Sequence, residues 1–537
     1  MFKIKFSHLP IIIVASFSVL IIAALAYREL LFQPAKINVY DLIHKKTAPD
    51  IKWPSDTIRS AGLLNCYYKD SAKNNLWTGR EPEQEHNRIM LLQMLSFADS
   101  LGLNAKEYHV GYIKTYDSLL HYPNFRESGQ RAENELVFTD AALSFLFDAA
   151  YGKEIDISYS GIKYNIDSAG IVNMFGHLLI HRNWRKTLDS LQPDSYQFEA
   201  LKNAHNRIKA FVPEFPPIES IDTSDNFAIK RHAVLKLQAY GLIDQTAGND
   251  SVSDSSFNSA LKNFQKMMNT DTTGTLNKET LEALNFPLAK RLEEIKRSLN
   301  FWRWAARLQE QQFVFVNVAG ACLEVVDNGS KQIEMRVIAG QPDKQTPLFA
   351  AYITNVTTYP HWVLPRSIAI KETLPRIIKN INFLAKNNME VMDYKGNILD
   401  PYKINWRKYS KNNFPFIIRQ ATGCDDALGV LKFDLSSPYD IYLHDTNAKH
   451  LFSRNNRFLS HGCIRLEKPV EFAKYLLGSR FDSVSEKYLS KCMKNQEPGN
   501  IRVKKRVPIV IFYLTTTINQ NGELQFYKDV YGLEDIN

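Results

Sequence analysis

The sequence predicts a multidomain α+β protein that begins with an apolar helix, continues as helices and ends as a mainly-β region. Three observations predict this fold class. Residues 9–27 contain no charged side chain. Apolar residues recur at helical spacing through much of residues 60–289, whereas short β-branched and aromatic runs dominate from residue 313 onward. A chain of 537 residues is long enough for about three folded units.

The apolar segment near the N-terminus predicts a membrane helix. Leu9 to Tyr27 would span about 30 Å as a helix, which is enough to cross a bilayer. Lys3 and Lys5 precede it, so the positive-inside tendency leaves the N-terminus in the cytoplasm. A cleaved signal peptide is the alternative, because Ala24-Leu25-Ala26 resembles a cleavage site. The apolar run exceeds the usual core of about 7–15 residues, which favours an uncleaved single-pass anchor.

The next region is predicted to be helical. Residues 91–98 and 138–147 both show amphipathic spacing, and residues 101–108 suggest a junction between two helices. No group of chemically active residues stands out here, so packing is the default interpretation of its aromatic side chains.

A different helical pattern follows between residues 228 and 289. Residues 233–242 and 257–265 form two amphipathic elements, and a Gly274-containing turn separates the second from a third helix over residues 278–284. Asn277 is placed to cap that third helix. The three apolar faces predict a small helical bundle.

Strand patterns begin after Trp304. Residues 313–318 and 323–329 suggest a hairpin, followed by strands over residues 333–340 and 354–362. Helical spacing then interrupts the pattern between residues 370 and 414, which predicts an insertion. The alternative for this insertion is a surface excursion with no gating role. Strands resume at residues 417–420 and 427–433, and a last strand covers residues 508–515.

These patterns divide the chain into five regions: an anchor over residues 1–34, a linker over 35–59, a helical scaffold over 60–227, a three-helix domain over 228–289, and a mainly-β domain over 290–537 with an insertion over about 370–416.

The net charge of +9 is spread out and gives no support to nucleic-acid binding. Five cysteines, namely Cys66, Cys322, Cys424, Cys463 and Cys492, leave at least one thiol unpaired within the chain.

The most informative motif is Ser460-His461-Gly462-Cys463-Ile464-Arg465, preceded by His444-Asp445-Thr446. Residues 441–443 predict a strand that delivers His444 at its end. A cysteine on a Gly-containing turn can present its sulfur to a substrate, and a nearby histidine can take its proton to give a thiolate–imidazolium ion pair. Pro469 predicts the start of a helix after the cysteine, whose dipole would stabilise the thiolate.

Two other interpretations of these residues are open. Taken alone, Cys463 would be a small buried apolar residue. His444, His450, His461 and Cys463 are also conceivable zinc ligands, but the spacings typical of compact zinc sites are absent. The glycine and the two histidines around Cys463 therefore favour nucleophilic chemistry.

The pattern of His444, a spacer and Ser-His-Gly-Cys-apolar-Arg resembles the active-site signature of the L,D-transpeptidases, whose catalytic module is the YkuD-type β domain. The resemblance implies that Cys463 is the nucleophile and that His444 is its base, oriented by a backbone carbonyl near Asp445. The amides of Gly462 and Cys463 are then the expected oxyanion donors.

The same resemblance assigns supporting roles to further residues. Ser460 and His461 would support the site, and Trp362 would contact the substrate. Arg465 would bind a substrate carboxylate through its guanidinium, or it would be a structural ion-pair partner.

The resemblance extends over nearly everything after the anchor. Residues 228–289 resemble the small peptidoglycan-binding domain, although a spacer bundle is the alternative. Residues 60–227 are similar to the helical scaffold of the larger, YcbB-like L,D-transpeptidases. Trp362, Pro365 and Ile368 match a Trp-x-x-Pro-x-x-Ile element of that subgroup, in which the insertion is a lid over the active site.

The resemblance implies an enzyme that forms 3→3 cross-links between peptidoglycan stem peptides through a thioester on Cys463, with no metal or organic cofactor. The apolar segment, with Lys3 and Lys5 before it, predicts that the catalytic part faces the periplasm and cell wall from an anchor in the cytoplasmic membrane. A thiol carboxypeptidase or hydrolase acting on the same stem peptides is one alternative. A non-catalytic wall-binding protein is another.

Overall fold

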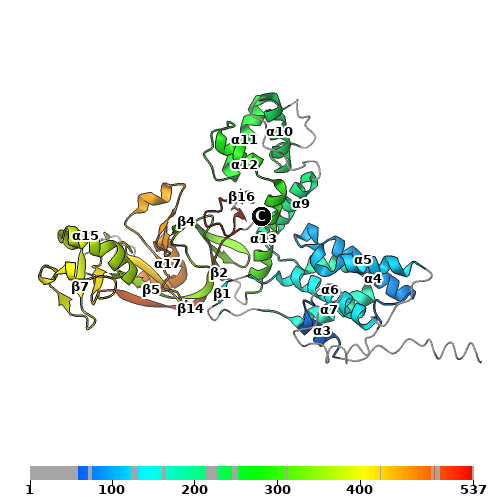
Figure 1. Ribbon diagram of the computed structural model, residues 1–537, viewed down its shortest axis with the longest axis horizontal. Coiled ribbons are helices and arrows are strands. Elements are labelled where there is room, and N and C mark those ends of the chain that lie inside the picture. The colour runs from blue at the N-terminus through cyan, green and yellow to red at the C-terminus, as the bar shows by residue number, and fades with distance from the viewer. Residues whose placement is uncertain are drawn as a thin grey trace, which may run out of the picture. The chain divides into compact units, whose positions relative to one another are not determined.

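The computed structural model describes residues 58–69, 75–122, 131–155, 157–159, 162, 165–212, 226–244, 252–308, 312–423, 425–484, 489, 496–519 and 521–534 (Figure 1). The described residues form two compact units. The first takes in residues up to Ala98, Asn104–Phe147 and Asp167–Ser190. The second takes in Asp99–Leu103, Asp148–Ile166 and everything from Leu191 onward.

The membrane helix expected over residues 9–27 lies outside the described residues. Within the part of the chain that the structure does describe, no helix combines the length and the apolar character needed to cross a bilayer.

The first unit is helical, as the sequence predicted. Its α-helices are α3 (Ala61–Tyr67), α4 (Pro82–Ser96), α5 (Val110–Leu120), most of α6 (Arg131–Tyr151), α7 (Ser168–His181) and α8 (Trp184–Leu191). Its core is aromatic: the ring of Trp77 stacks on that of Phe175, with 6.1 Å between centroids, and meets the edge of Phe138 at 6.4 Å. The buried carboxylate of Glu135 accepts hydrogen bonds from the amides of Trp77 and Thr78.

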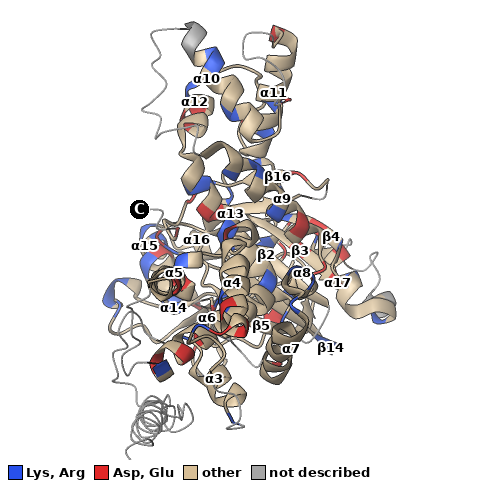
Figure 2. Ribbon diagram, turned by 90° about the vertical axis from the view of Figure 1, so that its right-hand side faces the viewer, with Lys and Arg blue, Asp and Glu red and all other residues tan. Residues whose placement is uncertain are grey.

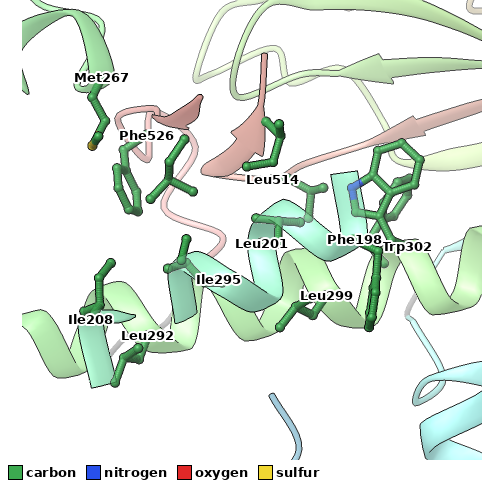
Figure 3. Packing of buried hydrophobic residues seen from close by; sticks show 14 of the residues in the cluster. Phe198, Leu201, Ile208, Met267, Leu292, Ile295, Leu299, Trp302, Leu514 and Phe526 are labelled. Atoms are coloured by element: carbon green, nitrogen blue, oxygen red, sulfur yellow. The ribbon is translucent and has the colours of Figure 1, made fainter. Parts of the chain in front are cut away.

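Helix α9 (Tyr196–Phe211) belongs to the second unit, although the sequence grouped it with the scaffold. Its apolar face packs along α13 (Leu288–Ala305), and Figure 3 shows Phe198, Leu201 and Ile208 of α9 against Leu292, Ile295, Leu299 and Trp302 of α13. Because this face is buried on α13, the unit boundary falls before α9 and not near residue 227.

The three-helix domain forms as expected from α10 (Asn226–Ala239), α11 (Asp254–Met267) and α12 (Lys278–Asn285). The Asn277 side chain accepts a hydrogen bond from the amide of Thr280, so it caps α12 as predicted. The buried amide of Gln265 holds the turn between α11 and α12. Its nitrogen donates to Thr275 O and Thr280 Oγ1, and its oxygen accepts from Gly274 N at 2.7 Å.

The main sheet of the mainly-β domain closes on itself. Its strands are β2 (Gln312–Asn317), β3 (Cys322–Asp327), β4 (Ser330–Gly340), β5 (Phe349–Thr358), β10 (Leu431–Leu435), β11 (Leu443–His444), β13 (Ile464–Leu466) and β14 (Gly499–Phe512), with β1 (Ser158–Tyr159) beside β5 and β12 (Phe458–Ser460) beside β4. The order is β5-β10-β11-β13-β4-β3-β2-β14, and β14 pairs again with β5. The predicted hairpin is β2–β3.

Two further elements support this sheet. Helix α17 (Pro469–Leu477) begins at the predicted proline, and Phe472 on it is fully buried in the core of the closed sheet. A separate hairpin, β15 (Thr516–Ile518) and β16 (Leu524–Phe526), packs on the α9–α13 pair, where Figure 3 shows Leu514 and Phe526.

The insertion is a small folded body with its own core. Strands β6 (Trp362–Val363), β7 (Met389–Met392), β8 (Ile398–Leu399) and β9 (Ile417–Gln420) form a separate sheet, and α14 (Arg366–Ile368), the π-helical turn η5 (Ala369–Thr373), α15 (Leu374–Lys379), α16 (Asn382–Lys386) and the short η6 (Pro401–Lys403) and η7 (Trp406–Lys408) complete it. Leu374, Ile377 and Trp406 are buried together in its core. We call residues 362–420 the lid body.

We expect Gln265→Leu to loosen the three-helix domain. The substitution leaves the buried amide of Gly274 without its partner and removes the bond to Thr280 Oγ1, which should cost about 2 kcal/mol of local stability. Hydrogen exchange of residues 261–284 in the full chain should then accelerate at least tenfold. Lys262→Gln, an exposed change one turn earlier, is the control, and equal exchange in both variants would contradict the structural role of Gln265.

Candidate active site

The candidate site lies where three short strands meet. Lys432 on β10 is opposite His444 on β11, and His444 is beside Arg465 on β13. Residues at matched positions of neighbouring strands project to the same face. Lys432, His444 and Arg465 therefore share one face of the sheet.

The opposite face of the same strands is the hydrophobic core. Phe433, Leu443 and Ile464 alternate with the three polar residues, and each is fully buried. The ring of Phe433 contacts that of Phe472 on α17, with 5.0 Å between centroids. One face thus secures the strands and leaves the other for chemistry.

The register also brings Cys463 and His444 onto that polar face. Cys463 directly precedes β13, and Tyr442 directly precedes β11; Ile464 N donates to Tyr442 O at 3.2 Å, which continues the pairing to their level. Because side chains alternate along a strand, Cys463 and Tyr442 lie on the same side as His444 and Arg465. The rings of Tyr442 and His444 are 5.7 Å apart between centroids.

A tight turn holds the cysteine. The buried Ser460 hydroxyl accepts from Gly462 N at 3.1 Å and donates to Cys463 O at 2.6 Å. Gly462 has a φ of +117°. Residues with a Cβ atom rarely adopt this backbone conformation, so glycine is required at this point of the turn. Ser460 therefore fixes the geometry of the turn.

A second tie to this turn comes from Thr346, which the sequence did not single out. Thr346 Oγ1 donates to Gly462 O at 2.8 Å and accepts from Gly340 N at 2.9 Å. Tyr531 supports Thr346 in turn, since its hydroxyl accepts from Thr346 N and donates to Gly340 O. In the sequence, this role of Thr346 was indicated only by two polar residues, 345–346, between two predicted strands.

The expected pair of oxyanion donors is changed by these contacts. The Gly462 amide already donates to Ser460 Oγ, so in this conformation it does not point at a substrate carbonyl. The Cys463 amide, which is the other predicted donor, takes no part in this hydrogen bond.

His444 is fixed through its other ring nitrogen. Its Nδ1 hydrogen-bonds Asp445 O, which is the kind of carbonyl that the sequence predicted. A donating Nδ1 leaves Nε2 as the proton acceptor. The Asp445 carboxylate is not free to act on the ring, because Val430 N, Thr446 N and the Lys449 ammonium all bind it.

Electrostatics favour a neutral thiol beside a neutral imidazole. Burial, with help from the Arg465 charge, lowers the pKa of His444 to about 3. Burial raises the pKa of the Cys463 thiol, although hydrogen bonds from Tyr442 and the Lys432 and Arg465 charges oppose this rise. The lowered pKa of His444 and the raised pKa of Cys463 both oppose the predicted resting ion pair.

The helix whose dipole was expected to stabilise the thiolate does not begin directly after Cys463. Strand β13 separates Cys463 from the first residue of α17, Pro469. The thiol is thus not at a helix N-terminus, and the dipole falls off within one turn.

Tyr442 is the functional residue that sequence reasoning missed most clearly. The charge of Cys463 raises the pKa of Tyr442 and Trp362 lowers it, so Tyr442 interacts with both side chains. The hydrogen bond that the Cys463 sulfur donates goes to Asp440 O at 3.9 Å. Burial raises the pKa of Tyr442 above its usual value, so its hydroxyl remains a donor. Trp362, predicted to touch substrate, interacts with Tyr442.

His461 links the catalytic turn to the lid body. Its Nε2 lies 2.6 Å from Glu372 Oε1, and Lys344 Nζ lies 3.1 Å from the same oxygen. These contacts lower the pKa of Glu372, with His461 as the largest cause. Glu372 is on the π-helical turn η5, and such turns recur at functional sites.

Arg465 has no carboxylate partner among the described residues, so no structural ion pair occupies it there. Its Nε is buried and makes no hydrogen bond in that part of the chain. Burial lowers the pKa of the guanidinium.

The other cysteines give no alternative centre in the described residues. Cys66, Cys322 and Cys463 are free thiols, and Cys424 and Cys492 lie outside the described residues. Nowhere in the described ranges do three His, Cys, Asp or Glu side chains gather in a group that could hold a metal ion.

Comparisons with known proteins agree with this site. Residues 311–509 match the YkuD family model, described as the L,D-transpeptidase catalytic domain, residues 62–204 match the scaffold domain, and residues 231–284 match the "Putative peptidoglycan binding domain". A Haemophilus influenzae protein named "Putative L,D-transpeptidase" is 34% identical over 221 residues, which are 41% of this chain and 44% of that protein. The chain thus spans less than half the length of that relative.

Two solved structures are distantly similar. The L,D-transpeptidase from Mycobacterium smegmatis shares 14% identity at a TM-score of 0.18, over 38% of this chain and 58% of that one. An Enterococcus faecium L,D-transpeptidase shares 10% identity at a TM-score of 0.18, over 42% of this chain and 64% of that one. The family matches confirm the resemblance seen in the sequence, and likenesses this slight add no further argument.

The raised pKa of Cys463 predicts a pH profile. Alkylation by iodoacetamide should still accelerate as the pH passes about 8.5, the ordinary pKa of cysteine, because the thiolate is the reactive form. A preformed ion pair would give a constant rate at neutral pH. Tyr442→Phe should slow alkylation about tenfold at pH 8, because it removes a hydrogen bond to the thiolate. Peptide mass mapping measures the rates, with exposed Cys66 as the internal reference.

Proposed function

We propose that this chain, whose residues 311–509 belong to the L,D-transpeptidase catalytic domain family, is a cysteine-dependent acyltransferase that forms 3→3 cross-links between peptidoglycan stem peptides. The observation that carries the proposal is the pairing of β11 with β13, which puts Cys463 and His444 on one polar face. The fixed Nδ1 contact of His444 supports its role as the base.

The first half-reaction acylates the enzyme. His444 Nε2 takes the proton of the Cys463 thiol as the sulfur attacks the carbonyl that links the third, L-centred residue to the terminal D-alanine of a donor tetrapeptide. The carbon–nitrogen bond then breaks, and the His444 imidazolium returns its proton to the leaving amine of D-alanine. A thioester remains on Cys463.

The second half-reaction transfers the acyl group. The side-chain amine of a diamino acid on a neighbouring stem attacks the thioester, and His444 accepts the proton that this amine loses. The carbon–sulfur bond breaks, and the departing thiolate takes the proton from His444. The lowered pKa of His444 keeps its Nε2 unprotonated at neutral pH, so it can accept a proton in each half-reaction.

Several neighbours have proposed roles in these steps. Tyr442 donates a hydrogen bond to the sulfur as negative charge develops, and Trp362 positions Tyr442. The Cys463 amide stabilises the tetrahedral oxyanion, within a turn that Ser460 holds. Arg465, which has no carboxylate partner among the described residues, binds a carboxylate of the stem peptide.

The setting of this chemistry is also a proposal. The uncharged run over residues 9–27 with two preceding lysines supports a single-pass anchor in the cytoplasmic membrane, with the catalytic part in the periplasm. The match of residues 231–284 supports peptidoglycan as the partner of the three-helix domain. The lid body is proposed to close over bound substrate through Glu372.

Intact mass after incubation with purified disaccharide-tetrapeptide tests the first half-reaction. We expect a thioester adduct on the wild type with release of D-alanine, and none on Cys463→Ala. Dimers linked 3→3 should appear among the wild-type products. Only tripeptide and D-alanine would identify a carboxypeptidase, and no adduct together with no turnover would leave a wall-binding protein.

The contact between Glu372 and His461 predicts a measurable effect of the lid body. Glu372→Gln removes the charge and should lower the acylation rate constant about two- to fivefold, since a partly exposed ion pair contributes up to about 1 kcal/mol. Glu390→Gln is the matched control, because Glu390 pairs with Arg419 inside the lid body. Equal rates in the two variants would show that the Glu372 contact does not act on catalysis.

A further inference from the structure

The lid body carries most of the excess positive charge of the chain. Residues 366–416 contain ten Lys and Arg against four Asp and Glu, whereas the whole chain has 66 against 57. Figure 2 shows Lys and Arg clustered at α15. A concentrated positive field raises the local concentration of anionic ligands.

The four acidic residues of this segment are already engaged elsewhere. Glu372 pairs with His461 and Lys344, and Glu390 pairs with Arg419 at 2.7 Å. Asp393 binds the amides of Lys395 and Asn397 in its own turn, and Asp400 caps η6 through the amide of Tyr402.

Two of the cations face a cavity instead of a carboxylate. A cavity of about 470 Å³ lies between the end of α15 and the η6–η7 segment, with Lys379 and Arg407 in its lining. Neither side chain forms an ion pair with any residue that the structure describes. No Asp or Glu lines the cavity. The lining therefore carries two positively charged residues and no negatively charged one.

The remaining lining adds hydrogen-bonding and apolar surface. The side chains of Asn380 and Asn405 offer amides, and the ring of Tyr402 is 62% exposed. The Tyr402 hydroxyl bonds Asn382, which fixes the ring. Behind the cavity, Trp406 is buried and its indole donates to Pro401 O, so the wall is rigid. The volume falls within the range of small-ligand sites.

We propose that this lid cavity is a second subsite that binds the carboxylate-bearing end of a peptidoglycan stem peptide, apart from the chain being cleaved at Cys463. Arg407 and Lys379 bind the carboxylate, the two asparagines hydrogen-bond peptide or acetamido groups, and Tyr402 packs on the apolar face of the ligand. The inference rests on the proposed function for its choice of ligand.

Equilibrium binding tests the subsite. Purified full-length Cys463→Ala binds disaccharide-tetrapeptide in a calorimeter, with and without Lys379→Gln plus Arg407→Gln. We expect at least tenfold weaker binding in the cavity variant. Lys386→Gln plus Lys395→Gln is the control, because it removes the same charge from exposed positions of the lid body outside the cavity. Equal affinities in the two double variants would overturn the proposal.

Two readouts locate the ligand and its chemistry. Hydrogen exchange of residues 376–381 and 401–407 should slow on binding in the control variant and not in the cavity variant. A tetrapeptide whose carboxylates are amidated should give the control variant no protection of these two segments, as the native ligand gives none in the cavity variant. Protection that is absent from both segments, or amidation without effect, would overturn the carboxylate site.

The outcome is separable from the proposed function. Thioester formation in the wild type tests Cys463 chemistry and does not depend on the cavity. If the wild type forms the thioester while the cavity variant binds as the control does, the subsite fails and the acyltransferase stands. If no thioester forms although the cavity variant binds weakly, the anion site stands and the acyltransferase fails.

Discussion

The site depends on a register that is only two residue pairs long. Leu443 pairs with Ile464 and His444 with Arg465 in the parallel β11–β13 contact. A slip of one residue would send His444 into the core and Leu443 to the polar face. The full burial of Leu443, Ile464 and Phe433 prevents that slip, so hydrophobic packing on one face determines catalytic geometry on the other.

Separation along the chain explains which features the sequence could predict. The hairpin β2–β3, the cap at Asn277 and the start of α17 at Pro469 depend on neighbours close in the chain, and each appears as predicted. Thr346 and Glu372 reach the catalytic turn across 116 and 89 residues, and no local period announces such contacts. Trp362 was identified only through a family pattern, and its interaction with Tyr442 depends on the fold.

The expectations that the structure opposes share one physical cause, which is the burial of His444 and Ser460. Cys463 and His444 were expected to be charged because their residue types form ion pairs in solvated clefts, but burial penalises both charges. The Gly462 amide was expected to face substrate, yet the buried Ser460 hydroxyl beside it needed partners of its own. Burial is a property of the folded chain and is not encoded in a motif of six residues.

The raised pKa of the partly exposed Cys463 thiol has a consequence for chemical durability. Peroxide and foreign disulfides react with thiolates far faster than with thiols, and the sulfinic and sulfonic acids that follow are dead ends. A nucleophile that loses its proton only as a substrate arrives is exposed to such damage for a small fraction of its lifetime. The raised pKa of Cys463 therefore slows oxidation of this sulfur between turnovers.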